Sequence, residues 1–159
     1  MGAALVAKAA RISQEGWGEA SGVIVQADSL RARVIPLAET DAQVYGQALE
    51  AMRSPTGTEP ERRDAEIADA LSRAADVPLQ IAEAAADVAA LGALVAERAN
   101  EAVCAEAAAG AALAEASARI AAQLVEINLA VAPADERVSK ARRFADEAAA
   151  SARAALRSS

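Results

Sequence analysis

Apolar side chains recur every three or four residues along most of this sequence, and glycine and proline residues interrupt that pattern at a few points. Such a period is typical of amphipathic α-helices, and the interruptions mark where helices begin and end. Five helical segments follow, at residues 2–14, 22–52, 60–98, 101–131 and 134–157. The one β-like run, "GVIVQ", is too short and too isolated to build a sheet. The sequence therefore predicts a single all-α domain, 1–159, folded as an antiparallel bundle of about five helices.

Proline residues predict interruptions within this layout. Pro36 lies inside the second segment and is expected to kink or break that helix, because proline removes one backbone hydrogen bond. Thr58 or Glu59 suits the residue before the third helix, and Pro60 then lies in its first turn. At the "DVP" stretch, Asp76 is expected to cap a helix restart. The second and third segments are therefore both expected to be interrupted.

Two acidic residues fall on the apolar faces of their helices. At about 100° per residue, the polar residues of the segment 101–131 gather on one side of the helix. The opposite side holds Gly110, Leu113, Ser117, Ile120, Leu124 and Asn128, and Glu106 falls with this apolar group. Asp41 falls in the same way on the apolar face of the segment 22–52. Burial raises the pKa of a carboxyl group towards neutrality, which suits a general acid or base, so two such acids on neighbouring helices predict a catalytic site.

A structural explanation stands beside this catalytic one. Glu106 lies near the start of its helix, where it could interact with the helix dipole or extend into solvent. Asp41 could instead form an ion pair with Arg98 or Arg119. It could also be held by Tyr45, a residue type that is more often part of a core than of a binding site. From the pattern alone, the structural role is favoured for both acids.

Alanine supplies most of the apolar content and changes what kind of core is expected. The chain is 54% hydrophobic but only 2% aromatic, and stretches such as "AEAAADVAA" are nearly all methyl groups. One buried carbon contributes only about 0.8 kcal/mol, so the compensation must come from close approach of the helices. We therefore expect a bundle that completes its core across a subunit interface, as a homodimer.

Charge and residue content argue against several kinds of function. A net charge of −7 without any basic stripe argues against a nucleic-acid partner and against an anionic membrane. No sufficiently long apolar run and no signal peptide are expected, which leaves a cytoplasmic location. The chain has no histidine and one cysteine, Cys104, so no metal site is predicted. Catalysis would rest on carboxylates, amides, hydroxyls or Tyr45.

Three stretches carry a resemblance to a known family: "ETDAQVYGQALEAM", "ERRDAEIADALSRAADVPLQ" and "AEAAAGAALAEASARIAAQLVEINL". In this order they resemble the cyclodeaminase/cyclohydrolase family, which includes the cyclodeaminase domain of formiminotransferase-cyclodeaminase and methenyltetrahydrofolate cyclohydrolase. The most diagnostic parts are Asp-Ala-x-x-Tyr at 41–45, "AADVPL", and Ile-Asn-Leu at 127–129. The resemblance implies an all-helical homodimer with folate sites near the subunit contacts, a tetrahydrofolate derivative as substrate, and no cofactor. Members either expel ammonia from 5-formimino-tetrahydrofolate or hydrolyse the methenyl ring.

The chain departs from this family in places that bear on the site. Members begin with a longer first helix preceded by a Gly-Gly-Ser motif, whereas "MGAALVAKAARIS" resembles the latter half of that helix. Ala105 and Glu106 stand where the family has Ser-Asp. The resemblance implies that Glu106 is the acid/base and that Asp41 orients the cationic amidine, while Tyr45 or Asn128 donates hydrogen bonds to the substrate. Two hypotheses remain: a tetrahydrofolate one-carbon enzyme, with its activity kept or lost, or a non-catalytic helical dimer that serves as a binding or assembly module.

Overall fold

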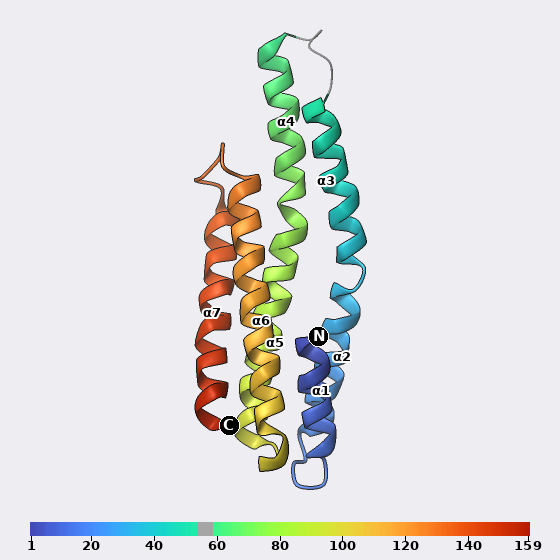
Figure 1. Ribbon diagram of the computed structural model, residues 1–159, viewed down its shortest axis with the longest axis vertical. Coiled ribbons are helices and arrows are strands. Elements are labelled where there is room, and N and C mark those ends of the chain that lie inside the picture. The colour runs from blue at the N-terminus through green and yellow to red at the C-terminus, as the bar shows by residue number, and fades with distance from the viewer. Residues whose placement is uncertain (54–58) are drawn as a thin grey trace.

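The computed structural model describes residues 1–53 and 59–159, and all regular elements in these ranges are α-helices. They are α1 (Gly2–Ile12), α2 (Ala20–Val34), α3 (Leu37–Arg53), α4 (Pro60–Ala74), α5 (Asp76–Arg98), α6 (Glu101–Asn128) and α7 (Glu136–Ser158). Two residues separate α2 from α3 and one separates α4 from α5, so each pair continues along a common rod (Figure 1). Successive rods run in opposite directions, and α5, α6 and α7 pack against one another. The predicted all-α antiparallel bundle of about five helical rods is confirmed.

Proline residues set two helix boundaries where the sequence predicts them. The break between α2 and α3 falls at Ile35 and Pro36, as expected for a proline inside a helical segment. α4 begins at Pro60 with Glu59 as its N-cap residue, which confirms a helix start at this point. Thr58, the alternative residue before this helix, lies outside the described residues.

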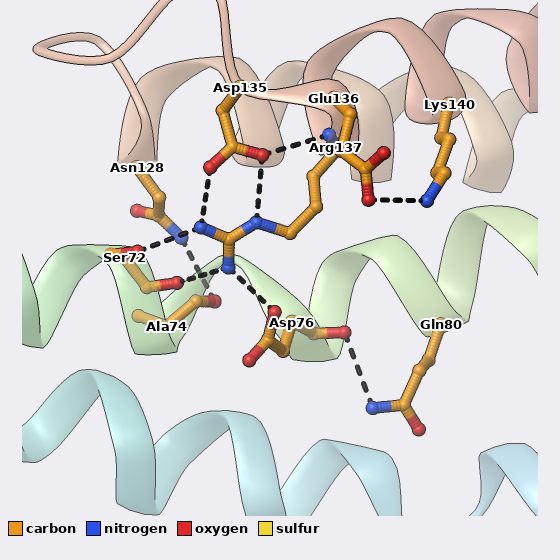
Figure 2. A network of polar contacts seen from close by, with 9 residues as sticks. All are labelled: Ser72, Ala74, Asp76, Gln80, Asn128, Asp135, Glu136, Arg137 and Lys140. Atoms are coloured by element: carbon orange, nitrogen blue, oxygen red, sulfur yellow. Dashed lines mark hydrogen bonds and ion pairs between the residues drawn. The ribbon is translucent and has the colours of Figure 1, made fainter.

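Asp76 does not cap α5, contrary to the expectation. The N-cap residue is Ala75, which has no capping side chain, and Asp76 is the first residue of the helix. Its carboxylate instead accepts a hydrogen bond of 2.7 Å from Nη1 of Arg137. The same guanidinium donates to the backbone carbonyl of Ser72 at 2.8 Å, and in bidentate fashion to Asp135 at 2.9 and 3.0 Å (Figure 2). One arginine of α7 therefore ties the α4–α5 junction to the turn before α7.

The Arg137 contacts predict a pH-dependent stability. The Arg137 side chain and backbone amide both donate to Asp135, and they lower the pKa of that carboxyl group to about 2. An unfolded aspartate has a pKa of about 3.9, so this stabilisation is fully present above that pH and is lost as the pH falls towards about 2. We expect urea titrations to show a steeper loss of unfolding free energy between about pH 4 and pH 2 in the wild type than in Asp135→Asn, whose amide still caps α7. Equal slopes in the two proteins would contradict this role of the ion pair.

Glycine and alanine fill the closest contacts between helices. A Cβ atom on Gly110 would lie 2.9 Å from Cγ2 of Val6 and 3.0 Å from the carbonyl oxygen of Gly2, where α6 meets α1. A Cβ atom on Gly92 of α5 would lie 2.9 Å from Cβ of Ala111 on α6. All three distances are shorter than ordinary van der Waals contact, so these positions have no room for a side chain. The close helix approach expected from the alanine content is confirmed.

The larger apolar residues of α6 face outward, contrary to the predicted orientation of this helix. The buried side carries small residues: Val103, Ala107, Ala111, Ala114, Ala118, Ala121 and Val125. The outward side carries Leu113, Ile120, Leu124 and Ile127, which are 42%, 59%, 42% and 65% exposed. These four residues, named here the α6 stripe, recur at helical spacing and lie along one side of the helix. The sequence pattern gave the correct helical period and correctly placed Gly110 and Asn128 inside, but it wrongly placed Leu113, Ile120 and Leu124 in the core.

The α4–α5 rod contains one stretch that is long and apolar enough to cross a membrane by length and composition alone. No such stretch was expected, because the sequence contains no uninterrupted apolar run of that length. Half of this stretch is buried inside the bundle, and an alanine-rich core helix passes the same test. Packing within the bundle therefore accounts for its composition.

Candidate functional site

Glu106 lies near the start of α6 and faces α1. α6 begins after Asn100, whose side chain caps the helix by accepting a hydrogen bond from the backbone amide of Ala102. One turn further along, Oε1 of Glu106 accepts a hydrogen bond of 2.6 Å from Nζ of Lys8 on α1. The Glu106 side chain is 37% exposed, so this acid is half-buried and not fully enclosed as predicted. The sequence did not predict the role of Lys8, because the spacing of residues within one helix does not indicate contacts between residues far apart in the chain.

The second carboxylate oxygen of Glu106 has a different environment. Oε2 is buried and accepts no hydrogen bond from any described residue. A buried polar atom without a partner lowers stability by roughly 1–3 kcal/mol, so this oxygen would gain from a donor supplied by a ligand or by another chain. Glu106 therefore has one carboxylate oxygen, Oε1, that is held by an ion pair. Its other oxygen, Oε2, accepts no hydrogen bond from the described residues of its own chain.

Asp41 and Tyr45 lie one turn apart on α3. Asp41 is half-buried and has no hydrogen bond or ion pair with any described residue. Tyr45 is 47% exposed, so it is not part of the core. The two arginines considered as partners for Asp41 have other carboxylates: Arg98 pairs with its neighbour in sequence, and Arg119 pairs one turn away on its own helix. The structural explanation offered for Asp41, an ion pair or a hydrogen bond to Tyr45, is therefore wrong for the described part of the chain.

Within one subunit, α3 does not reach α6. α3 contacts α2, α4 and α5, and among the described residues it makes no contact with α6. The expectation that Asp41 and Glu106 face one another from neighbouring helices is therefore wrong for a single subunit. Their catalytic roles stay predictions.

Asn128 is buried and holds the α4–α5 junction together. Pro78 has no backbone N–H, so the carbonyl of Ala74, four residues earlier, lacks its usual helical donor. Nδ2 of Asn128 donates to that carbonyl at 3.1 Å (Figure 2). Asn128 is 8% exposed, and its Oδ1 accepts no hydrogen bond from the described residues. The two diagnostic stretches "AADVPL" and Ile-Asn-Leu therefore meet at this junction.

The four predicted site residues do not converge within one subunit. At 1.5 Å per residue, Glu106 and Asn128 lie about 33 Å apart along α6, near opposite ends of the helix. The described residues also contain no group of three or more His, Cys, Asp or Glu side chains arranged to hold a metal ion. Of the four predicted site residues, Glu106 is the one whose carboxylate forms an ion pair among the described residues, with Lys8.

Fold and site together define an alanine-rich all-α bundle with an ion-paired glutamate on its longest helix. The model of the formiminotransferase-cyclodeaminase family matches residues 1–157, and the chain belongs to this family. A solved formiminotetrahydrofolate cyclodeaminase from Thermotoga maritima has a similar structure, with a TM-score of 0.84 at 19% identity. The match covers 99% of this chain and 81% of that chain, and at this identity it shows the common fold. A comparison with curated protein sequences gives no match.

Proposed function

We propose that this chain is a tetrahydrofolate one-carbon enzyme that uses Glu106 as its general acid and base. Family membership supports the substrate class, since the match extends over almost the whole chain. The observation that carries the catalytic assignment is the Glu106 carboxylate, with Oε1 held by Lys8 and Oε2 without a donor among the described residues. Because the Glu106 side chain is 37% exposed, a substrate can approach its carboxylate, which can then receive a proton.

Two reactions of one carbon atom fit this arrangement. In deamination, N10 of 5-formimino-tetrahydrofolate attacks the formimino carbon and loses its proton to Glu106. The carbon–nitrogen bond to the imino group then breaks, and Glu106 returns the proton to the departing ammonia. In hydrolysis, Glu106 takes a proton from the water that attacks the methenyl carbon, and it returns that proton to the ring nitrogen that leaves. The hydroxyl group formed on the carbon loses its remaining proton to solvent as the formyl C=O bond forms. Each sequence moves one proton to the carboxylate and back, so Glu106 ends as it began.

We infer that the complete site forms between two copies of the chain. Glu106 precedes Leu113 by two helical turns, on the side of α6 that carries the α6 stripe. A second copy packed on this stripe would therefore lie beside Glu106. Asp41 and Tyr45 from that copy would orient the cationic amidine, while Asn128 could use only its Oδ1, because its Nδ2 bonds Ala74. A cytoplasmic location also stays a prediction.

The homodimer is expected to depend on the α6 stripe. Ile120→Asp places a charge in the middle of this surface, where burial of an unpaired carboxylate is strongly unfavourable. Light scattering after size-exclusion chromatography should give twice the chain mass for the wild type and the mass of one chain for Ile120→Asp. Ile35→Asp is the matched control, since Ile35 is similarly exposed, at 63% against 59%, but lies between α2 and α3. A dimer that persists in Ile120→Asp, or a wild type that is monomeric at all concentrations, would refute this interface.

The alternative function is a non-catalytic dimer that serves as a binding or assembly module. The favouring observation is that Asp41 and Tyr45 lie on α3, which does not contact α6 among the described residues, while Glu106 and Asn128 lie near opposite ends of α6. Incubation with 5-formimino-tetrahydrofolate and with methenyl-tetrahydrofolate distinguishes the two functions, because the methenyl bridge has its own absorbance band. Formation or loss of that absorbance supports the enzyme. Absence of turnover on both substrates at micromolar enzyme, with a folded dimer, supports the module.

A further inference from the structure

A cavity of about 220 Å³ lies beside the first turn of α1, where α1, α2, α5 and α6 meet. Its wall is mostly methyl groups and branched apolar side chains, among them Val34, Ile81, Val88 and Leu113. Two polar side chains, Arg31 and Ser117, complete the lining, and none of the lining residues is acidic. The cavity is therefore largely apolar, and Arg31 is the one lining residue with a charged side chain.

Arg31 has no carboxylate partner among the described residues. Its neighbour Arg33, two residues further along α2, lies 3.6 Å from Asp87 and 3.8 Å from Glu83. Arg31 is an exposed residue, so a ligand can reach its guanidinium group from solvent. An unpaired guanidinium beside an apolar space suits a ligand that is apolar at one end and anionic at the other.

We propose that this cavity binds the aromatic ring of a small carboxylate ligand and that Arg31 binds its carboxylate. An apolar cavity of about 150 Å³ accommodates benzene, and 220 Å³ therefore holds one substituted six-membered ring. Arginine matches a carboxylate through two parallel N–H donors, which gives both affinity and orientation. Charge complementarity thus selects an aromatic acid over a neutral aromatic ligand.

This inference rests on the proposed function for the identity of the ligand. In a folate, the aminobenzoyl ring carries the glutamate carboxylates on one side and N10 of the reacting centre on the other. Leu113 lines the cavity and lies about 10 Å from Glu106 along the same side of α6. In the proposed pose the aminobenzoyl ring lies in the cavity, its glutamate carboxylate meets Arg31, and its one-carbon unit points towards Glu106. Arg31 becomes the residue that selects for the glutamate end of the substrate.

Calorimetry with 4-aminobenzoylglutamate, a fragment that lacks the one-carbon unit, tests the cavity without any chemistry. We expect the wild type to bind this fragment and to bind 4-aminobenzamide, which has no carboxylate, at least 10-fold more weakly. Arg31→Gln should weaken fragment binding by about 10–100-fold, the range expected for a charged hydrogen-bonded pair. Arg33→Gln, the control on the same helix, should change it less than twofold. Ser117→Leu fills the cavity from an exposed position and should abolish binding in a folded protein, as checked by circular dichroism.

The outcomes separate this inference from the proposed function. Fragment binding that depends on Arg31 in a protein without turnover supports the cavity assignment and refutes the enzyme. Turnover of the folate substrate with an unchanged KM in Arg31→Gln refutes the cavity assignment and leaves the enzyme intact. No binding of the fragment to the wild type, or equal binding by the wild type and Arg31→Gln, also overturns the inference.

Discussion

Glu106→Gln is expected to abolish turnover of the folate substrate while the fold is retained. Glutamine has nearly the same shape as glutamate but cannot accept a proton and return it, and loss of a general acid or base lowers the rate by about 100–10,000-fold. The substitution also removes the ion pair with Lys8. That pair is more than one-third exposed on both sides, and such pairs contribute only about 0–1 kcal/mol. The rate of change of methenyl absorbance measures the loss, and a thermal melt within a few degrees of the wild type shows that folding is not its cause.

Glu115→Gln provides the matched control for this variant. Glu115 lies on the same helix and also forms an ion pair, with Arg119 one turn away. Its replacement changes the net charge by the same amount and removes a comparable contact, but it should leave turnover within twofold of the wild type. Wild-type turnover in Glu106→Gln would remove Glu106 from the mechanism. A comparable loss in both variants would attribute the effect to charge and not to proton transfer.

The helix layout was predictable because its main determinants are local. Pro36 breaks a helix and Pro60 begins one through the chemistry of their own backbone nitrogens. The effect of Pro78 is different, because the carbonyl that it leaves without a donor is satisfied by Asn128 on another helix. Periodicity placed Asn128 on an inward face, but no spacing could assign it to Ala74. Local rules therefore predict helix ends, and the groups that complete those ends come from tertiary contacts.

The orientation of α6 was not predictable from hydrophobicity, because size and hydrophobicity act in opposite directions in this bundle. Leucine and isoleucine are the more hydrophobic residues, and the pattern placed Leu113 and Ile120 inside. The contact between α5 and α6 instead excludes large side chains, and only alanine and glycine fit where Gly92 meets Ala111. The large residues are left on the outer side of the helix. The same close packing explains why a charged residue in line with them, Glu106, is half-exposed and within reach of Lys8.

The candidate site was only partly predictable for a related reason. Glu106 and Asp41 were identified from single-helix patterns, and both are half-buried. Whether two such residues meet depends on which helices are neighbours, and α3 contacts α5 but not α6 among the described residues. The Lys8–Glu106 pair joins the first and sixth helices. A contact between two distant helices depends on the arrangement of the whole bundle. It therefore cannot be predicted from the sequence of one helix.

Gly92→Ala is expected to lower the free energy of unfolding by up to about 2 kcal/mol, although alanine is the better helix former. The new Cβ atom would lie 2.9 Å from Cβ of Ala111 and 3.2 Å from the carbonyl oxygen of Ala107. Both atoms are fixed to the backbone of α6 and cannot move aside, so the two helices must separate. Overpacking of this kind typically costs about 1–3 kcal/mol, which exceeds the gain of about 1 kcal/mol in helix propensity.

Gly46→Ala is the control that isolates packing from propensity. Gly46 lies inside α3, and a Cβ atom there would have no neighbour within 4 Å. Only the propensity effect remains, so this variant should be more stable than the wild type by about 0.5–1 kcal/mol. Urea titrations of the two variants should therefore shift in opposite directions from the wild type. If Gly92→Ala were also more stable than the wild type, the contact between α5 and α6 would have room for a larger side chain. Close packing at this contact would then not explain why the α6 stripe faces outward.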